Sequence, residues 1–215
     1  MTVEHRLPIE EIFLTPGPHP NGMQATADGI WILDQETNEI ALVDYAGKVL
    51  RTLKTDSDRG SGITHDGRAL WVASTYSCEI LRIDPDSGQT LARYATPGAQ
   101  KTGGHGLEWR NGILWLATPP SATIYQIDVA DGFKVIHECP APGNRPHGLG
   151  WHGDQLWCVE TTRRGIFQVD PTNGSLLQHI DIPEPEPEPH GMTIWEGHFY
   201  YCDANTSKVC RLACP

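Results

Sequence analysis

The chain alternates short apolar segments with polar turns, and one such pattern recurs five times along its length. Each copy begins at a glycine followed by an apolar residue, and these marker glycines lie 40 to 44 residues apart. They are Gly22, Gly62, Gly106, Gly148 and Gly191. A repeat of this length indicates that each copy is one structural unit. We therefore divide the chain into five units that start near residues 21, 61, 105, 147 and 190.

Each copy has the same internal order of features, which predicts four short β-strands. The apolar segment after the marker glycine leads into a hairpin turn such as Asp66 and Gly67. A strand led by an aromatic residue follows, as at Trp71, and then an alternating strand such as residues 79–84. In most copies a second glycine turn leads to a fourth strand. Four strands per repeat, with no helical periodicity, predict an all-β, five-bladed β-propeller.

The two ends of the chain complement each other. The fifth copy has only three strands, and residues 8–15 form a strand that belongs to no copy. We predict that this N-terminal strand pairs with the last blade and closes the ring, because closure removes an exposed sheet edge. Residues 1–215 would then form a single domain. Between the fourth and fifth copies, residues 183–189 read PEPEPEP, which favours an extended spacer in solvent. A rigid wall or lid beside a site is the alternative.

Composition and charge exclude several classes of protein. Apolar residues make up 39% of the 215 residues, and no apolar run approaches the roughly 20 residues of a membrane helix. Acidic residues outnumber basic ones 27 to 16, which argues against a nucleic acid or an anionic membrane as partner. The first residues lack a signal-peptide pattern, so we expect a cytoplasmic protein with six reduced cysteines. A monomer or a small homo-oligomer is expected.

Histidines occupy a repeated position at the start of the innermost strand, which lines the channel of a propeller. The residues before the five marker glycines are Asn21, Ser61, His105, His147 and His190. Three imidazoles from adjacent blades therefore point toward one axis. Three histidines with an open fourth position are the ligands of catalytic zinc sites, and imidazole also binds iron. We predict a divalent transition metal (Zn, Fe or Mn) on the three histidines. The alternative is that they bind channel water and backbone.

Carboxylates occupy a second repeated position, at the end of the second strand near the same rim. Glu160 and Asp203 hold this position in two copies that also supply a histidine. Such a carboxylate acts as a ligand, orients a ligand or serves as a general base. The alternative is that it caps the following loop by accepting backbone N–H groups. Glu160 and Asp203 are our candidate catalytic residues.

Four further polar residues are candidates for substrate binding. Asn21 and Ser61 share the repeated position of the histidines, and Arg145 and Arg163 are placed to hold an anionic group. For both arginines a solvated surface role is the alternative. The sequence carries no motif for a nucleotide cofactor.

The repeat HGLxW, followed by a glycine turn, by LW and by an alternating strand that ends in Asp, resembles the streptogramin B lyase group of β-propellers. It is similar, more loosely, to NHL-type and gluconolactonase-type propellers. The lyase family has seven blades, whereas this chain carries five repeats. The resemblance implies a histidine, a glutamate and a divalent metal near the channel mouth that open a cyclic depsipeptide by elimination. The matching residues here would be His147, His190 and Glu160.

These observations favour a metal-dependent enzyme that acts on a small-molecule substrate as a lyase or a hydrolase. A tris-histidine iron oxygenase is the redox variant of the same site. A propeller that binds a ligand or a protein without catalysis is the alternative from another class.

Overall fold

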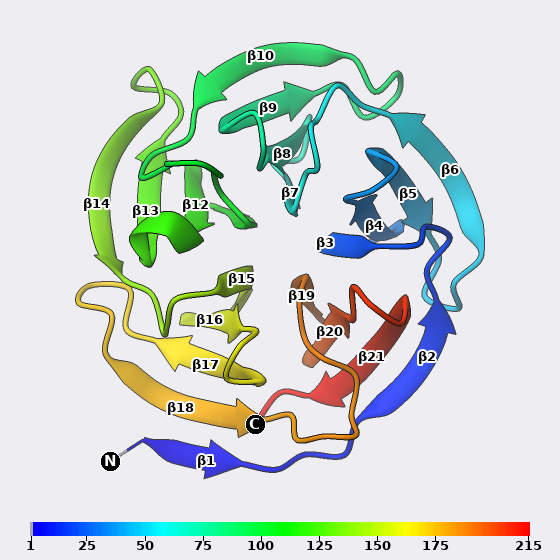
Figure 1. Cartoon of the computed structure of the whole chain (residues 1–215), viewed down its shortest axis with the longest axis vertical. Helices are drawn as coiled ribbons and strands as arrows, with labels where there is room; N and C mark the ends of the chain where they lie inside the picture. The colour runs from blue at the N-terminus through cyan, green and yellow to red at the C-terminus, as the bar shows by residue number, and fades with distance from the viewer. Residues whose placement is uncertain (1) are drawn as a thin grey trace.

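Five β-sheets surround a central channel in the computed structural model, which describes residues 2–215 (Figure 1). The strands of each blade follow in order from the channel outward. Blade 1 consists of β3 (Pro20–Thr26), β4 (Gly29–Asp34), β5 (Glu39–Val43) and β6 (Val49–Lys54), and blade 2 of β7 (Gly62–His65), β8 (Leu70–Ser74), β9 (Glu79–Ile83) and β10 (Thr90–Ala95). Blade 3 consists of β11 (Gly106–Arg110), β12 (Ile113–Thr118), β13 (Thr123–Asp128) and β14 (Lys134–Pro140), blade 4 of β15 (Pro146–His152), β16 (Gln155–Glu160), β17 (Gly165–Val169) and β18 (Leu176–Asp181), and blade 5 of β19 (Met192–Trp195), β20 (His198–Cys202), β21 (Lys208–Ala213) and β2 (Glu10–Leu14). The predicted five-bladed β-propeller is confirmed.

The N-terminal strand closes the ring as predicted. β2 pairs antiparallel with β21 and becomes the outer strand of blade 5. Ion pairs cross this seam, because Arg211 contacts Glu10 and Lys208 contacts Glu11, each at 2.6 Å. The first and last segments of the chain therefore share one sheet.

A second N-terminal strand, which the sequence pattern did not predict, adds to the sheet of the neighbouring blade. β1 (Val3–His5) pairs parallel with β18 and gives blade 4 a fifth, outermost strand (Figure 1). Arg6 lies 3.5 Å from Asp181, and His5 Nε2 lies 2.7 Å from the side-chain oxygen of Gln178. Three residues are too few to show a hydrophobic period, so the pattern could not reveal this strand.

The marker glycines form the narrowest part of the channel. A Cβ on Gly62 would lie 1.8 Å from the carbonyl oxygen of His105, and a Cβ on Gly106 would lie 1.9 Å from that of His147. The inner strands thus approach each other more closely than any side chain allows. At this level the channel has no volume for a water molecule. The ring of glycines sets the radius of the propeller and separates its two mouths.

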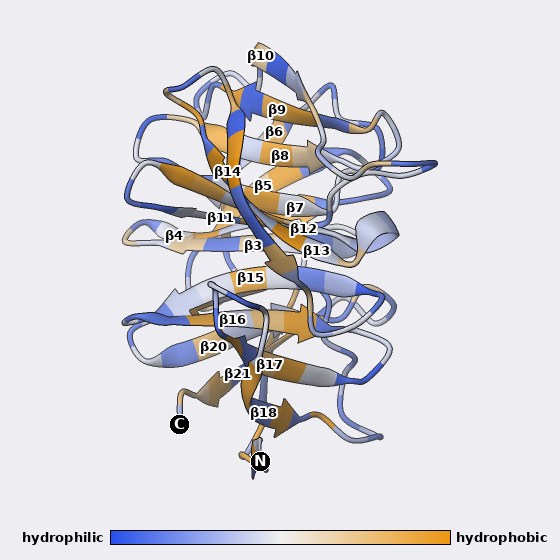
Figure 2. Ribbon diagram, turned by 90° about the vertical axis from the view of Figure 1, so that its left-hand side faces the viewer, coloured by the Kyte–Doolittle hydropathy of each residue, from blue (hydrophilic) through white to orange (hydrophobic). Residues whose placement is uncertain are grey.

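Five hydrophobic clusters lie between neighbouring blades, one at each interface. Trp71 and Trp157, which lead second strands, are fully buried there. Figure 2 shows apolar residues along the strands and polar residues in the loops at both ends of the blades. Within residues 2–215 the structure has one helical turn, η1 (Pro119–Ser121), and no helix suited to crossing a bilayer. All six cysteines are free.

Candidate functional site at the channel mouth

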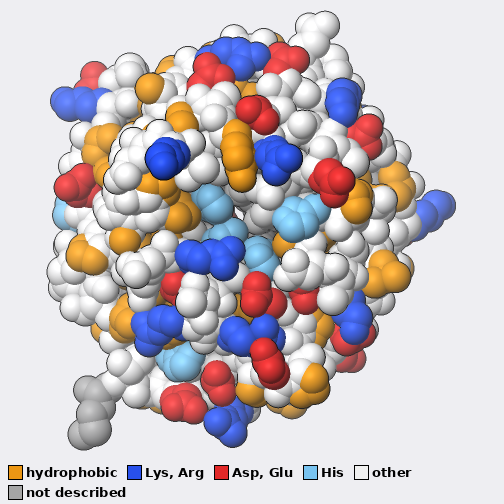
Figure 3. Space-filling model, in the orientation of Figure 1, with side chains coloured by type: hydrophobic (Ala, Val, Ile, Leu, Met, Phe, Trp, Pro, Cys, Tyr) orange, Lys and Arg blue, Asp and Glu red, His pale blue; other side chains and the backbone are white. Residues whose placement is uncertain are grey.

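The three histidines come together at one end of the channel, which we call the channel mouth. Each lies directly before its marker glycine, where the inner strand begins. The backbone N–H of His105 donates to the Ala117 carbonyl and that of His190 to the Cys202 carbonyl, each at 2.9 Å. These bonds hold the first residue of the inner strand against the second strand of the same blade. Figure 3 shows the pale blue histidines in the central hollow of this face.

The imidazoles contact one another edge to face. His105 Nδ1 lies 3.1 Å from His147 Nε2, and the centroids of these two rings are 4.4 Å apart. The rings of His147 and His190 are 5.1 Å apart and nearly perpendicular. His147 and His190 are buried, and His105 lies at the edge of the cavity. The prediction that three imidazoles meet at the mouth is therefore correct.

The three imidazoles are neutral at physiological pH. Burial, together with the positive charge of Arg145, lowers the pKa of His105 to about 3. Burial also lowers the pKa of His190 to about 4. For His147, burial and the neighbouring histidines hold the pKa well below its usual value. Each ring therefore has an unprotonated nitrogen that can accept a proton or bind a metal.

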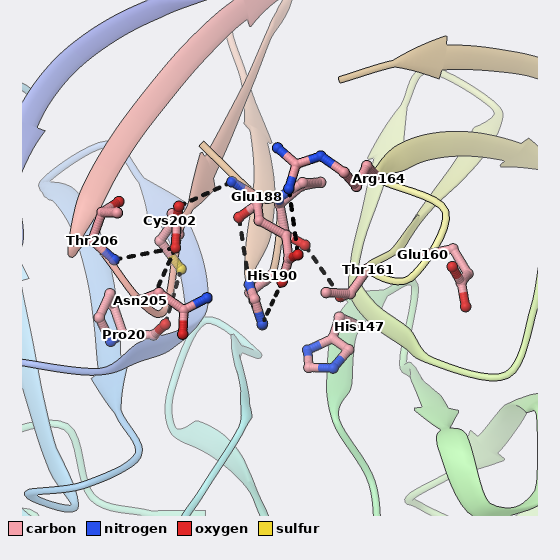
Figure 4. Close-up of polar contacts among 12 residues, drawn as sticks. Pro20, His147, Glu160, Thr161, Arg164, Glu188, His190, Cys202, Asn205 and Thr206 are labelled. Carbon is pink, nitrogen blue, oxygen red and sulfur yellow. Dashed lines mark hydrogen bonds and ion pairs between the residues drawn. The ribbon is translucent and has the colours of Figure 1, made fainter. Parts of the chain in front are cut away.

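The carboxylate beside the histidines is Glu188, which was not among the site residues predicted from the sequence. Its Oε1 lies 3.5 Å from His190 Nε2, and its backbone carbonyl lies 3.4 Å from His190 Nδ1. Its other carboxylate oxygen lies 3.4 Å from Arg164 (Figure 4). An Nδ1–H bond to this carbonyl leaves Nε2 as the basic nitrogen of His190, beside a carboxylate that stabilises the ring once it is protonated.

Residues 186–189 form part of the wall of the site. The Arg164 guanidinium donates to the carbonyl of Glu186, and the Thr161 hydroxyl donates to that of Pro189 at 3.1 Å. Pro187 and Pro189 are buried, whereas residues 183–185 are exposed. The expected spacer is thus correct only for the first half of the PEPEPEP segment. The second half is the wall that stood as the alternative.

Glu160 and Asp203 cap loops, as the alternative interpretation of their position proposed. Glu160 is 1% exposed, and its two oxygens accept the backbone N–H groups of Arg145 at 2.8 Å and Arg163 at 2.6 Å. Asp203 accepts the N–H groups of Asn205 at 2.7 Å and Glu188 at 3.0 Å. Burial alone would raise the pKa of Asp203, but these bonds lower it. A role as general base stays a prediction for both residues, and neither is among the residues that line the cavity.

The four predicted substrate-binding residues differ in their surroundings. Asn21 and Arg145 line the cavity at the channel mouth. The hydroxyl oxygen of Ser61 accepts from Gln35 at 2.8 Å and from Thr75 at 2.9 Å, so it is already hydrogen-bonded. Arg163 donates to a backbone carbonyl, and its guanidinium lies 4.3 Å from the centre of the Phe167 ring. It is not among the residues that line the cavity.

The cavity itself has a volume of about 490 Å³, which suits a small molecule. It is lined by His19, Asn21, Gln35, Thr75, Tyr76, Thr102, His105, Pro119, Arg145, His147, Glu188, His190 and Asn205. Gln35, Tyr76 and Asn205 lie in loops that follow the second strand of a blade, and Glu188 lies in the loop between β18 and β19. Only the unusual composition of residues 183–189 marked one of these loops in the sequence.

The three histidines are suitable metal ligands by residue type, but they are not placed together as ligands of one ion. Neutral imidazoles are good ligands for Zn or Fe, and His147 Nδ1 is buried without a hydrogen-bond partner. Among residues 2–215, however, no three His, Cys, Asp or Glu side chains are placed together as ligands. His105 and His147 would have to give up their mutual contact before three nitrogens could face one ion. The metal centre therefore stays a prediction.

Comparisons with known proteins support the fold. No family model and no curated protein matches the sequence. Among solved structures, a glutaminyl cyclase from Myxococcus xanthus aligns with a TM-score of 0.78 and 12% identity, over 99% of this chain and 97% of that chain. A catalytically inactive virginiamycin B lyase from Staphylococcus aureus with quinupristin aligns with a TM-score of 0.60 and 23% identity, over 91% of this chain and 66% of the lyase. A streptogramin B lyase aligns with a TM-score of 0.59 and 19% identity, over 97% of this chain and 74% of that chain. This confirms the resemblance to lyase-type propellers at the level of the fold.

Proposed function

We propose that the channel mouth is the active site of an enzyme that acts on a small molecule as a lyase or a hydrolase, with His190 as the general base. One observation carries the proposal: a neutral, buried imidazole and a carboxylate, 3.5 Å apart, line the same cavity. Two of the propellers with similar structures are a cyclase and a lyase, so this scaffold can support catalysis.

The chain's own residues supply the proton transfer. His190 Nε2 takes a proton from a substrate carbon in an elimination, or from water in a hydrolysis. Glu188 then stabilises the imidazolium through its carboxylate at 3.5 Å. The same Nε2–H returns the proton to the leaving group. Asp203 holds Glu188 by accepting its backbone N–H at 3.0 Å, and Arg164 holds the Glu188 carboxylate from the other side.

A metal-dependent form of this enzyme is the second candidate, favoured by the unpartnered Nδ1 of His147. His105, His147 and His190 would hold the ion. A bound Zn, Fe or Mn ion would polarise a substrate oxygen or lower the pKa of a bound water.

A pair of variants tests the proton-transfer step. The purified chain is assayed against esters, lactones, amides and β-substituted acids. His190→Gln should lower kcat by about 10²- to 10⁴-fold, since a positioned acid–base group contributes that much. Glu188→Gln should lower kcat by about tenfold, because the imidazolium loses its counter-charge. Glu184→Gln is the matched control, because it changes an exposed glutamate of the same PEPEPEP segment.

The outcomes separate the candidates. Full activity in His190→Gln, or no turnover in any substrate class, would contradict the proposal and favour a binding propeller. Elemental analysis of the wild type beside a variant with all three histidines replaced by alanine decides the metal. A near-stoichiometric ion that the variant loses would support the metal-dependent form.

A further inference from the structure

Three arginines of blade 4 lie near the channel mouth, and the protein itself uses two of them. Arg164 pairs with the Glu188 carboxylate at 3.4 Å, and Arg163 donates to the carbonyl of Pro142 at 2.8 Å. Arg145 lines the cavity, and within residues 2–215 its guanidinium has neither a carboxylate partner nor a hydrogen-bond acceptor. Only the backbone of this residue is held, because its N–H donates to Glu160 and its carbonyl accepts from the N–H of Thr161. A guanidinium that is left open at a cavity is a binding group for carboxylate or phosphate.

Arg145 has no ion-pair partner among residues 2–215. The neighbouring imidazoles are neutral, and the one carboxylate that lines the cavity, Glu188, is shared with Arg164. A second cavity of about 330 Å³, lined by His19, Gln35, Glu36 and Arg59, adjoins the first, because His19 and Gln35 line both. Figure 3 shows both basic and acidic side chains around the central hollow. The two cavities thus carry charges of both signs, Arg145 and Arg59 against Glu188 and Glu36, and a cation without an ion-pair partner at such a mouth attracts anions.

The floor of the cavity holds an unused acceptor opposite this cation. Asn21 is 4% exposed, lines the cavity, and its Oδ1 has no hydrogen-bond partner. His147, 2% exposed, has an unpartnered Nδ1 in the same cavity. A buried polar atom without a partner destabilises the empty site, and a ligand that donates a hydrogen bond recovers this cost. Unlike the Ser61 hydroxyl, which is already bonded, Asn21 Oδ1 is therefore an unused acceptor in the cavity wall.

We propose that the ligand of the channel mouth is a small organic anion that places its carboxylate or phosphate on Arg145 and donates an N–H or O–H to Asn21 Oδ1. This inference rests on the proposed function, because it assigns the substrate class of that active site. The anionic group anchors one end of the molecule at the rim. The hydrogen bond to blade 1 then orients the rest of it across the cavity, next to His190.

Binding of small probes to the full chain tests this inference without any assay of turnover. N-acetylglycine carries both a carboxylate and an N–H group, its methyl ester lacks the charge, and inorganic phosphate lacks the N–H group. Each probe is titrated at constant ionic strength, and the imidazole NMR signals report binding. The ester should bind about tenfold more weakly than the acid, because a charge-assisted hydrogen bond is lost. Binding of phosphate more tightly than N-acetylglycine would support the inference and identify a phosphate as the anion.

Three variants locate the anion. Arg145→Gln should weaken binding of N-acetylglycine by about tenfold or more and leave the ester unchanged. Asn21→Ala should weaken both probes by about fivefold, since both donate the N–H. Arg163→Gln is the matched control, because it removes the same charge from the same blade at a residue that does not line the cavity. It should change binding less than twofold.

The outcomes distinguish this inference from the proposed function. Equal binding of acid and ester, equal effects of Arg145→Gln and Arg163→Gln, or no binding of any anion up to its solubility limit would overturn the inference. His190→Gln should still bind N-acetylglycine. Binding that survives in this variant, together with an absence of turnover in the wild type, would retain the anion site and reject the catalytic role.

Discussion

Replacement of Gly106 by alanine tests whether the marker glycines set the radius of the propeller. A Cβ at this position would lie 1.9 Å from the carbonyl oxygen of His147. Non-bonded carbon and oxygen atoms stay about 3.3 Å or more apart, so β11 and β15 would have to separate by about 1.4 Å. Because the ring is closed, this displacement cannot be absorbed at a free edge. It must distort the neighbouring blades or break their contacts.

The cost follows from what the new methyl group meets. The clashing atom belongs to the backbone, so no side-chain rotation relieves the contact. Over-packing of a core costs about 1–3 kcal/mol, and we expect the upper part of this range. Alanine also restricts the unfolded chain, which returns about 0.4–1 kcal/mol. The net loss of about 2 kcal/mol corresponds to a fall of about 4–8 °C in the unfolding temperature of a chain of this size.

Calorimetry and urea unfolding measure this loss against a matched variant. Gly60→Ala also adds a methyl group at a buried glycine, but the nearest atom, at 2.9 Å, is a methyl carbon of Leu33, which can move. It should cost about 1 kcal/mol or less, because a small shift of that side chain relieves the contact. If Gly106→Ala were as mild as Gly60→Ala, the reasoning about the ring of glycines would be refuted.

Three further predictions concern acid stability, the loop cap and the N-terminus. Burial holds the pKa of His105 at about 3, so between pH 6.5 and about pH 3 the unfolded chain binds a proton there that the folded chain does not. The free energy of unfolding should fall by ~1.4 kcal/mol per pH unit for each such histidine as the pH drops, and urea unfolding with a chelator should show a slope smaller by one histidine in His105→Asn. Glu160→Gln should cost about 1–3 kcal/mol of stability, because an amide can accept only one of the two backbone N–H groups through its oxygen. Its folded fraction should keep its kcat, and a loss of turnover with unchanged stability would instead identify Glu160 as the base. Deletion of residues 1–6 should cost about 1 kcal/mol in thermal unfolding, since β1 adds only three residue pairs at the outer edge of blade 4, whereas deletion of residues 1–14 should prevent cooperative unfolding because blade 5 loses its outer strand.

The repeat could be read from the sequence because it reflects a local constraint. Each blade needs a glycine where its inner strand meets the next one, and a hairpin turn a few residues later, so both recur at a regular spacing. The same register places His105, His147 and His190 at equivalent positions, which is why their meeting could be predicted. Ring closure followed from the missing strand in blade 5. β1 could not be predicted, because its pairing with β18 is short, parallel and distant in sequence.

Only the hydrogen bonds in the structure distinguish the loop-capping carboxylates from the one beside the histidines. Glu160 and Asp203 hold a repeated position, and a repeated position serves what every blade needs, which here is a cap for the loop. Asp34 in blade 1 does the same, since its carboxylate accepts the N–H groups of His19 and Thr37. Glu188 lies outside the repeat. Its approach to His190 depends on bonds from other blades and loops, which no pattern along the chain records.

The candidate functional residues lie in the blades and loops whose sequences differ most from the common repeat. The loop between blades 4 and 5 carries the proposed base His190 and the Glu188 carboxylate. Blade 4 carries the unpaired Arg145, and blade 1 carries Asn21. These are also the blades that the N-terminal segment joins, because β1 extends blade 4, β2 completes blade 5 and the chain then enters blade 1 at β3. A site assembled from three blades needs those blades to keep a constant separation. The pairing of β1 with β18 and of β2 with β21 supplies this constraint. A variant that weakens these pairings should therefore disturb the His190–Glu188 contact before it disturbs blades 2 and 3.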